Sequence, residues 1–354
     1  MPRFRVPVFI SKFNVVVRIA LKLVVKFWQM CTTGMLILLL LYWLYGSLVA
    51  FGLLWAAMIG LAYNAQDMLL YYPDQPSSSR FFVESPSTFG LPYENLFVRA
   101  KDGVLLNLLL IKQPGPEIMK KAPTFVYLHG NAGNVGHRLY NSHGLHRNVR
   151  VNILLVEYRG YGKSGGVPSE SGLSFDAECA IDYLYSRSDI DHSNIILFGR
   201  SLGGAVAISS AVHPTYSNKL RAIIVENTFT SLPDIARYIF DFKLLKAIPV
   251  WMYKNKYPSR ERVKQMELPM LFISGLSDNL IPPYMMQDLF EHCHSLVKQM
   301  ARFEAGTHNE TWQCEGYYKS IHTFLNQVCS HSGTKDALRT NIEPTGTYIS
   351  MEHI

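Results

Sequence analysis

The stretch from Ile195 to Gly204, which reads I-I-L-F-G-R-S-L-G-G, constrains the fold of this chain more than any other. An aliphatic run passes into Gly-x-Ser-x-Gly over residues 199–203, and Ala-rich sequence follows. This order predicts a strand, a sharp turn and a helix, with Ser201 exposed at the turn as a candidate nucleophile. The glycines would let the strand and the helix approach each other closely. Because so short a pattern also recurs by chance, an ordinary glycine-bearing strand end is the alternative.

Two residues that follow later strands are suited to serve Ser201 as acid and base. Asp278 follows the apolar strand expected at 271–274, and His308 follows the last expected strand, at 300–303. A serine hydroxyl is a weak nucleophile near neutral pH, so an imidazole must accept its proton, and a carboxylate must orient that imidazole. The order Ser, Asp, His along the chain predicts a triad of Ser201, His308 and Asp278.

A glycine-containing loop precedes Ser201 and is the candidate oxyanion loop. It reads H-G-N-A-G-N over residues 129–134 and follows an apolar strand. The backbone N–H of Asn131, or of Ala132, together with that of Leu202 would stabilise the negative charge that develops on a carbonyl oxygen under attack. His129 has the chemistry of a catalytic base or a metal ligand, but its place before the turn favours a role in bracing the loop.

Glu226 is the alternative acid, since it also ends an apolar strand and the acid of a triad can be supplied by different strand ends. Metal-ligand spacing and a dinucleotide fingerprint are both missing from the sequence, so we expect no metal and no cofactor.

Strands and helices alternate through the middle of the chain, which predicts an α/β fold. A hairpin is expected first, with the turn at Lys-Asp-Gly. The later alternation indicates a mostly parallel sheet with helices on both faces, and such sheets carry their sites at the carboxyl ends of the strands. Strands are expected at 93–100, 104–112, 124–128, 151–157, 194–197, 223–225, 270–274 and 300–303, and helices at 136–145, 173–185 and 317–328.

Residues 228–262 interrupt the alternation with a long segment rich in aromatic and aliphatic side chains. Because loops of this length usually carry function, we expect a helical cap over the site. A connecting helix packed on the core is the alternative. The segment 63–92, with its prolines and serines, is expected to be a linker, and the polar tail at 331–354 is expected to be loosely ordered.

A long uncharged segment near the N-terminus predicts a membrane anchor. The chain has 354 residues, and none between 27 and 66 is charged. The apolar part, 34–62, exceeds the roughly 20 residues that cross a bilayer core. A cleaved signal peptide is the alternative, but this apolar stretch is about twice the usual length of its core. We therefore expect one transmembrane signal anchor and the lipid bilayer as a partner.

The basic residues are concentrated before this segment. The formal net charge is +7, and the first 33 residues hold six positive and no negative charges, so the remainder of the chain is close to neutral. This distribution argues against a nucleic-acid partner. By the positive-inside rule, residues 1–33 form a cytosolic arm and the chain after the span is luminal or extracellular, which is a type II topology.

Three motifs together resemble the α/β-hydrolase superfamily of serine hydrolases, and in particular its membrane-anchored branch. They are H-G-N-A-G-N at 129–134, Y-R-G-Y-G-K-S at 158–164 and G-R-S-L-G at 199–203. The resemblance covers about residues 93–330. It implies an α/β-hydrolase fold, the triad of Ser201, Asp278 and His308, and an ester, thioester or amide bond in a small-molecule, lipid-like or acylated substrate.

The predicted topology bears on an asparagine and four cysteines. Asn309 begins the only N-x-S/T sequon, next to His308, and in a luminal domain we expect it to carry a glycan. The cysteines of the same region would lie in an oxidising compartment, and their spacing leaves open whether they pair. The sequence also leaves the oligomeric state open. The four cysteines are Cys179, Cys293, Cys314 and Cys329.

Overall fold

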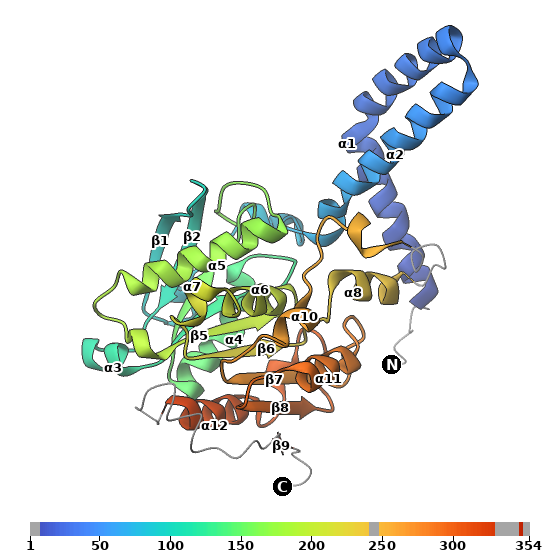
Figure 1. Ribbon diagram of the computed structural model, residues 1–354. Coiled ribbons are helices and arrows are strands. Elements are labelled where there is room, and N and C mark those ends of the chain that lie inside the picture. The colour runs from blue at the N-terminus through green and yellow to red at the C-terminus, as the bar shows by residue number, and fades with distance from the viewer. Residues whose placement is uncertain (1–7, 241–247, 330–346, 350–354) are drawn as a thin grey trace, which may run out of the picture. The chain divides into compact units, whose positions relative to one another are not determined.

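The structure is a computed structural model that describes residues 8–240, 248–329 and 347–349. These residues divide into two compact units, which are described separately (Figure 1). The first unit comprises the chain up to Leu70 together with Trp251–Lys254. The second comprises the described residues from Tyr71 onward, apart from that segment.

The first unit consists mainly of two helices, α1 (Val8–Tyr45) and α2 (Ser47–Leu70), which pack against each other. Gly46 separates them with a φ of 86°, a left-handed conformation that commonly ends helices. Among the described residues, α2 is the one helix long and apolar enough to cross a bilayer. An apolar helix of sufficient length is therefore present, but the predicted bounds of 34–62 are wrong, because Gly46 ends the first helix within them.

The second unit is built on a mixed sheet. Within the described residues nine strands pair in the order β1-β2-β4-β3-β5-β6-β7-β8-β9. β2 is antiparallel to both of its neighbours, and the strands from β4 to β9 are parallel to one another. The strands are β1 (Tyr93–Arg99), β2 (Leu105–Ile111), β3 (Thr124–Leu128), β4 (Asn152–Val156), β5 (Ile195–Arg200), β6 (Ala222–Glu226), β7 (Met270–Gly275), β8 (Lys298–Phe303) and β9 (Thr347–Ile349).

Helices cover both faces of this sheet (Figure 1). α4 and α12 belong to one face, and α5, α6, α10 and α11 belong to the other. Each lies along the chain between or after the parallel strands, as parallel connections require. The helices of this unit are α3 (Pro116–Lys121), α4 (Leu139–Gly144), α5 (Glu170–Tyr185), α6 (Leu202–Ala211), α7 (Pro214–Ser217), α8 (Leu232–Ile239), α10 (Ser259–Val263), α11 (Pro283–His292) and α12 (Tyr317–Cys329).

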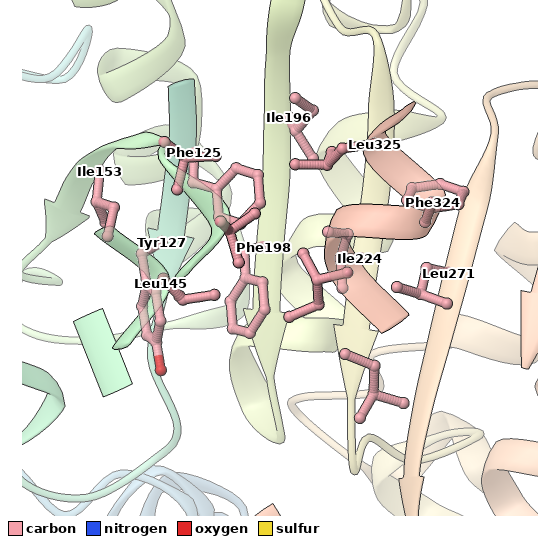
Figure 2. Close-up of a cluster of buried hydrophobic side chains, with 14 of the residues drawn as sticks. Phe125, Tyr127, Leu145, Ile153, Ile196, Phe198, Ile224, Leu271, Phe324 and Leu325 are labelled. Carbon is pink, nitrogen blue, oxygen red and sulfur yellow. The ribbon is translucent and has the colours of Figure 1, made fainter. Parts of the chain in front are cut away.

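The core on the α12 side is formed by alternate residues of the central strands, since successive strand residues point to opposite faces. Figure 2 shows Phe125, Phe198 and Ile224 from three neighbouring strands together with Phe324 of α12. Phe125 and Phe198 stack with ring centroids 5.8 Å apart. The intervening residues of these strands are buried on the α6 side, so the sheet is apolar on both faces. This burial accounts for the uninterrupted apolar runs in the sequence.

The predicted strands and main helices are confirmed with small shifts at their ends, and the predicted hairpin is the pair β1–β2. The segment 228–262, called the excursion below, contains α8 and α10, while residues 241–247 lie outside the described part. Its role as a cap over the site stays a prediction. Its two ends are joined, because Leu232 N–H donates to Lys256 O at 2.8 Å. Two expectations were wrong. Residues 71–92 belong to the second unit rather than to a free linker, and within the tail β9 pairs with β8.

Candidate active site

Ser201 lies at the turn between β5 and α6, with φ 54° and ψ −121°. A positive φ is strained for a residue with a side chain and persists only where the surroundings enforce it. Here the close approach of β3, β5 and α6 enforces it. A Cβ on Gly203 would lie 2.0 Å from Leu128 O, and one on Gly199 would lie 2.3 Å from Gly203 O. The sequence folds into this turn because only glycine fits at both positions.

The structure brings the three predicted residues Ser201, His308 and Asp278 together. His308 Nδ1 lies 2.7 Å from Asp278 Oδ2, and His308 Nε2 lies 3.1 Å from Ser201 Oγ. A carboxylate only accepts, so the proton is on Nδ1 and the free Nε2 accepts from the serine hydroxyl. This tautomer is the one that can take up the serine proton.

Asp278 is held by the backbone of its own loop. Its Oδ1 accepts from the N–H groups of Leu280 at 2.8 Å and Ile281 at 2.9 Å, which leaves Oδ2 for His308. The side chain of Asp278 is almost wholly buried, whereas that of His308 is partly exposed. A buried carboxylate with two backbone donors is fixed in orientation, and it fixes the imidazole in turn.

Asn227, directly after β6, joins the loops that carry the acid and the base. Its Oδ1 accepts from Gly275 N–H at 2.8 Å, and its Nδ2 donates to Thr307 O at 3.1 Å and to Thr311 Oγ1 at 3.0 Å. Its own φ is 46°, a conformation that asparagine tolerates better than most residues. This residue was not predicted from the sequence, in which its place at a strand end is the available signal.

The loop 129–134 lies against Ser201. A Cβ on Gly130 would lie 3.5 Å from Ser201 Cβ and 3.9 Å from Ser201 Oγ. The carbonyl of Asn131 accepts from Tyr72 N–H and from Tyr161 Oη–H, each at 2.9 Å. Leu202 is the first residue of α6, where backbone N–H groups point out of the helix without an intrahelical acceptor. The two predicted donor segments therefore flank the serine.

Known proteins resemble the chain as a whole. No protein-family model matches it. The α/β-hydrolase domain-containing protein WAV2 of Arabidopsis thaliana is 34% identical over 304 residues, which cover 82% of this chain and 96% of that protein. The chain belongs to the α/β-hydrolase family. An uncharacterized membrane protein of Saccharomyces cerevisiae is also 34% identical, over 79% of this chain and 94% of its own length.

A solved structure shows that this α/β-hydrolase shares its fold with an esterase. The Pyrococcus furiosus esterase Pf2001 superposes with a TM-score of 0.56 at 18% identity, covering 73% of this chain and 98% of the esterase. At that identity the likeness concerns the fold alone. The relative WAV2, named as an α/β-hydrolase domain-containing protein, supports a hydrolase. The apolar helix α2 and the membrane-protein relative support an association with the membrane.

The structure of the α/β-hydrolase places the alternative acid elsewhere. Glu226 Oε2 accepts from Tyr317 Oη–H at 2.6 Å, and its Oε1 lies 3.7 Å from Arg200 Nε. Burial raises the pKa of the Glu226 carboxyl, against the opposing charge of Arg200. Arg200 in turn donates to His308 O at 2.6 Å. Glu226 therefore supports the backbone of the histidine loop through Arg200, while the His308 ring is bonded to Asp278.

His129 of the α/β-hydrolase is fully buried at the start of the loop 129–134. Its Nδ1 lies 2.7 Å from Gly130 O, and its Nε2 lies 3.4 Å from Glu157 Oε1. Its ring packs on Tyr158 with centroids 4.4 Å apart. Nδ1 is thus bonded within the loop, while Nε2 is buried beside the Glu157 carboxylate without a hydrogen-bond partner. With the ring fully enclosed, the base and ligand alternatives for His129 are not favoured.

The four cysteines of the second unit, called the hydrolase unit below, are free thiols in this structure. Burial raises the pKa of Cys179, Cys293 and Cys329 to about 11 in each case. At neutral pH these side chains are therefore protonated and poor nucleophiles. Among the described residues, no three His, Cys, Asp or Glu side chains are grouped so that they could hold a metal ion.

Proposed function

We propose that the protein is a membrane-anchored serine hydrolase in which Ser201 is acylated by an ester, thioester or amide substrate. The observation that carries the proposal is the continuous hydrogen-bonded chain from Ser201 Oγ through His308 to Asp278. Two further features support the proposal. Ser201 has a strained backbone conformation at the start of a helix, and the neighbouring glycine-containing loop is held by hydrogen bonds. The same hydrogen-bonded arrangement of serine, histidine and carboxylate activates a hydroxyl in enzymes with several unrelated folds.

The proposed reaction proceeds in two steps. In the first, His308 Nε2 takes the Ser201 proton as Oγ attacks the substrate carbonyl, and Asp278 stabilises the imidazolium that forms. The N–H of Leu202, with that of Asn131 or Ala132, stabilises the oxyanion. His308 then protonates the leaving group, which departs as an alcohol, thiol or amine. In the second step, His308 activates water, and hydrolysis of the acyl-serine releases the acid and restores Ser201.

The excursion and the apolar helix α2 support a proposal for the substrate class. The residues between β6 and β7 supply aromatic side chains, among them the buried Phe229 and the exposed Tyr238 of α8. An apolar cap on a membrane-anchored enzyme favours a lipid-like or acylated substrate over a polar one. A peptidase on the same fold is the second enzymatic candidate, and a membrane-tethered binding protein without catalysis is the candidate of another class.

Ester hydrolysis tests the proposal. The full-length chain in detergent micelles is expected to hydrolyse p-nitrophenyl esters. Ser201→Ala is expected to lower kcat by roughly 10⁴-fold or more. Without the nucleophile, only the rate enhancement from substrate binding and the oxyanion hole remains. Parallel assays with thioesters and peptides separate the esterase from the peptidase. If the wild type is no faster than Ser201→Ala on all three classes, the hydrolase proposal is rejected in favour of a binding protein.

Tyr72 offers a test of the oxyanion loop. Its backbone N–H holds the Asn131 carbonyl, and proline has no such donor. Tyr72→Pro is expected to lower kcat about 10-fold or more with KM little changed, since the loop position matters most when negative charge develops. Tyr72→Ala, which keeps the N–H, is the matched control. Equal kcat values for the two variants would show that this hydrogen bond does not support catalysis.

The proposed topology is type II, with residues 1–33 cytosolic and the hydrolase unit luminal. Support comes from the concentration of positive charge before the apolar helix. In this topology the sequon at Asn309 is accessible to the glycosylation machinery of the lumen. Asn309 is exposed, and its Oδ1 accepts from Arg200 at 2.6 Å, which leaves Nδ2 for a glycan.

Glycosylation of Asn309 therefore tests whether the hydrolase unit is luminal. The full-length chain produced in animal cells is expected to gain electrophoretic mobility after peptide N-glycosidase treatment, by the equivalent of one glycan. Asn309→Gln is the matched control and is expected to migrate like the treated wild type, with no further change on treatment. A wild-type chain whose mobility does not respond to the glycosidase would contradict both the glycan and the luminal placement.

A further inference from the structure

The last turns of α2 carry the polar side chains Asn64, Gln66 and Asp67 on a mainly apolar helix, and Asn64 bonds within the helix to Gly60 O. Asp67 is the only charged residue of α2. A carboxylate at the end of a membrane-spanning helix is unfavourable unless it is paired or reaches the interface. The partners of Gln66 and Asp67 therefore indicate what lies beside this end of the helix.

The partners come from a segment more than 180 residues further along the chain. Gln66 Nε2 donates to Met252 O at 3.0 Å, and Gln66 Oε1 accepts from Lys254 N–H at 2.8 Å. Lys254 Nζ forms an ion pair with Asp67. Both side chains are thus satisfied by residues 251–254, which belong to the same compact unit as α2. This segment of the excursion lies at the level of the last turns of the helix.

The side chain beside these contacts is apolar and faces outward. Trp251 is 74% exposed, and it lies between Val250, which is also exposed, and Met252. Tryptophan is favoured at the boundary between headgroups and acyl chains, where its ring is partly desolvated and its N–H remains hydrated. The ion pair between Lys254 and Asp67 places a neutralised polar pair at the same boundary.

We infer that residues 251–254 are an interfacial contact of the protein with the phospholipid bilayer, in which Trp251 inserts beside the carboxyl-terminal end of α2. The inference rests on the membrane anchoring by α2 that is part of the proposed function. It adds a second, sequence-distant membrane contact, which comes from the excursion between β6 and β7. Lipid would then border the segment that we assign to the cap, whatever substrate the enzyme takes.

Quenching by lipid tests this contact. The full-length chain carries an environment-sensitive fluorophore on Trp251→Cys and is reconstituted in phosphatidylcholine vesicles that contain a doxyl-labelled lipid. Two further variants are the references. Phe51→Cys, 60% exposed on α2, reports insertion of the helix, and Val167→Cys, 76% exposed in the hydrolase unit, matches Trp251 in exposure. The unsubstituted chain, labelled in parallel, gives the background from its own cysteines.

The label at 251 is expected to be quenched by doxyl lipid at least about twofold more than the label at 167, and to be protected from aqueous iodide. If the label at 51 is quenched by lipid while that at 251 responds only to iodide, the inference is overturned and the anchor stands; Trp251 would then face water or another protein. If neither 51 nor 251 is quenched by lipid, the membrane-spanning assignment of α2 fails and the inference fails with it.

Discussion

Replacement of Asp278 by asparagine is expected to lower kcat for ester hydrolysis by roughly 10⁴-fold while the protein remains folded. An amide retains an oxygen for the N–H groups of Leu280 and Ile281, so the loop keeps its structure. Its NH₂ group, however, would face His308 Nδ1. The imidazole would then carry its proton on Nε2, where it cannot accept the Ser201 proton. Steady-state kinetics measure the loss, and thermal unfolding checks the fold.

The matched control is Glu226→Gln, which makes the same change in a second buried carboxyl group. Glu226 bonds to Tyr317 and Arg200 rather than to the His308 ring. We expect its kcat to fall by about 10-fold at most, through a small displacement of the histidine loop. A loss as large as that of Asp278→Asn would mean that the acid has been assigned to the wrong strand end.

Gly203→Ala is expected to destabilise the fold by about 4 kcal/mol or more, near the upper end of single-substitution effects. The new Cβ would lie 2.0 Å from the Leu128 carbonyl oxygen and 2.7 Å from that of His129. Both obstacles are backbone atoms, so α6 would have to move away from β3 and disrupt the buried packing between them. A domain of ordinary stability has only about 5–15 kcal/mol in total. Chemical unfolding in detergent measures the change.

Gly165→Ala is the matched control for this prediction. A Cβ there would meet only Leu105 O, at the ordinary contact distance of 3.6 Å. We expect its stability to lie within about 0.5 kcal/mol of the wild type. Equal stabilities of the two variants would show that the contact between α6 and β3 is not as tight as the structure has it.

The sheet and the serine turn could be predicted because local sequence determines them. The central strands are buried on both faces, so each reads as a short apolar run with breaks at the turns. The turn at Ser201 is specified by glycines that lie within five residues of each other. Asp278 and His308 were found because the carboxyl ends of parallel strands meet at one edge, so residues that follow different strands come together there.

The residues that position this site could not be found in the same way. Asn227 bonds to loops that begin 48 and 80 residues later in the chain, and Tyr72 bonds to Asn131 from a segment that was expected to be a linker. Nothing local distinguishes these residues from other polar or aromatic residues near turns. The break between two helices at Gly46 was not predicted for a related reason. Hydropathy does not indicate the φ angle of a single glycine.

Covalent labelling with a serine-reactive probe tests whether Ser201 is the nucleophile. The full-length chain is treated with a fluorophosphonate, digested, and analysed by mass spectrometry for the modified residue. One adduct is expected, on the peptide that contains Ser201, and it is expected to be lost in Ser201→Ala. An adduct on a different residue, or equally weak labelling of wild type and Ser201→Ala under conditions in which both are folded, would contradict the assignment of Ser201 as the nucleophile.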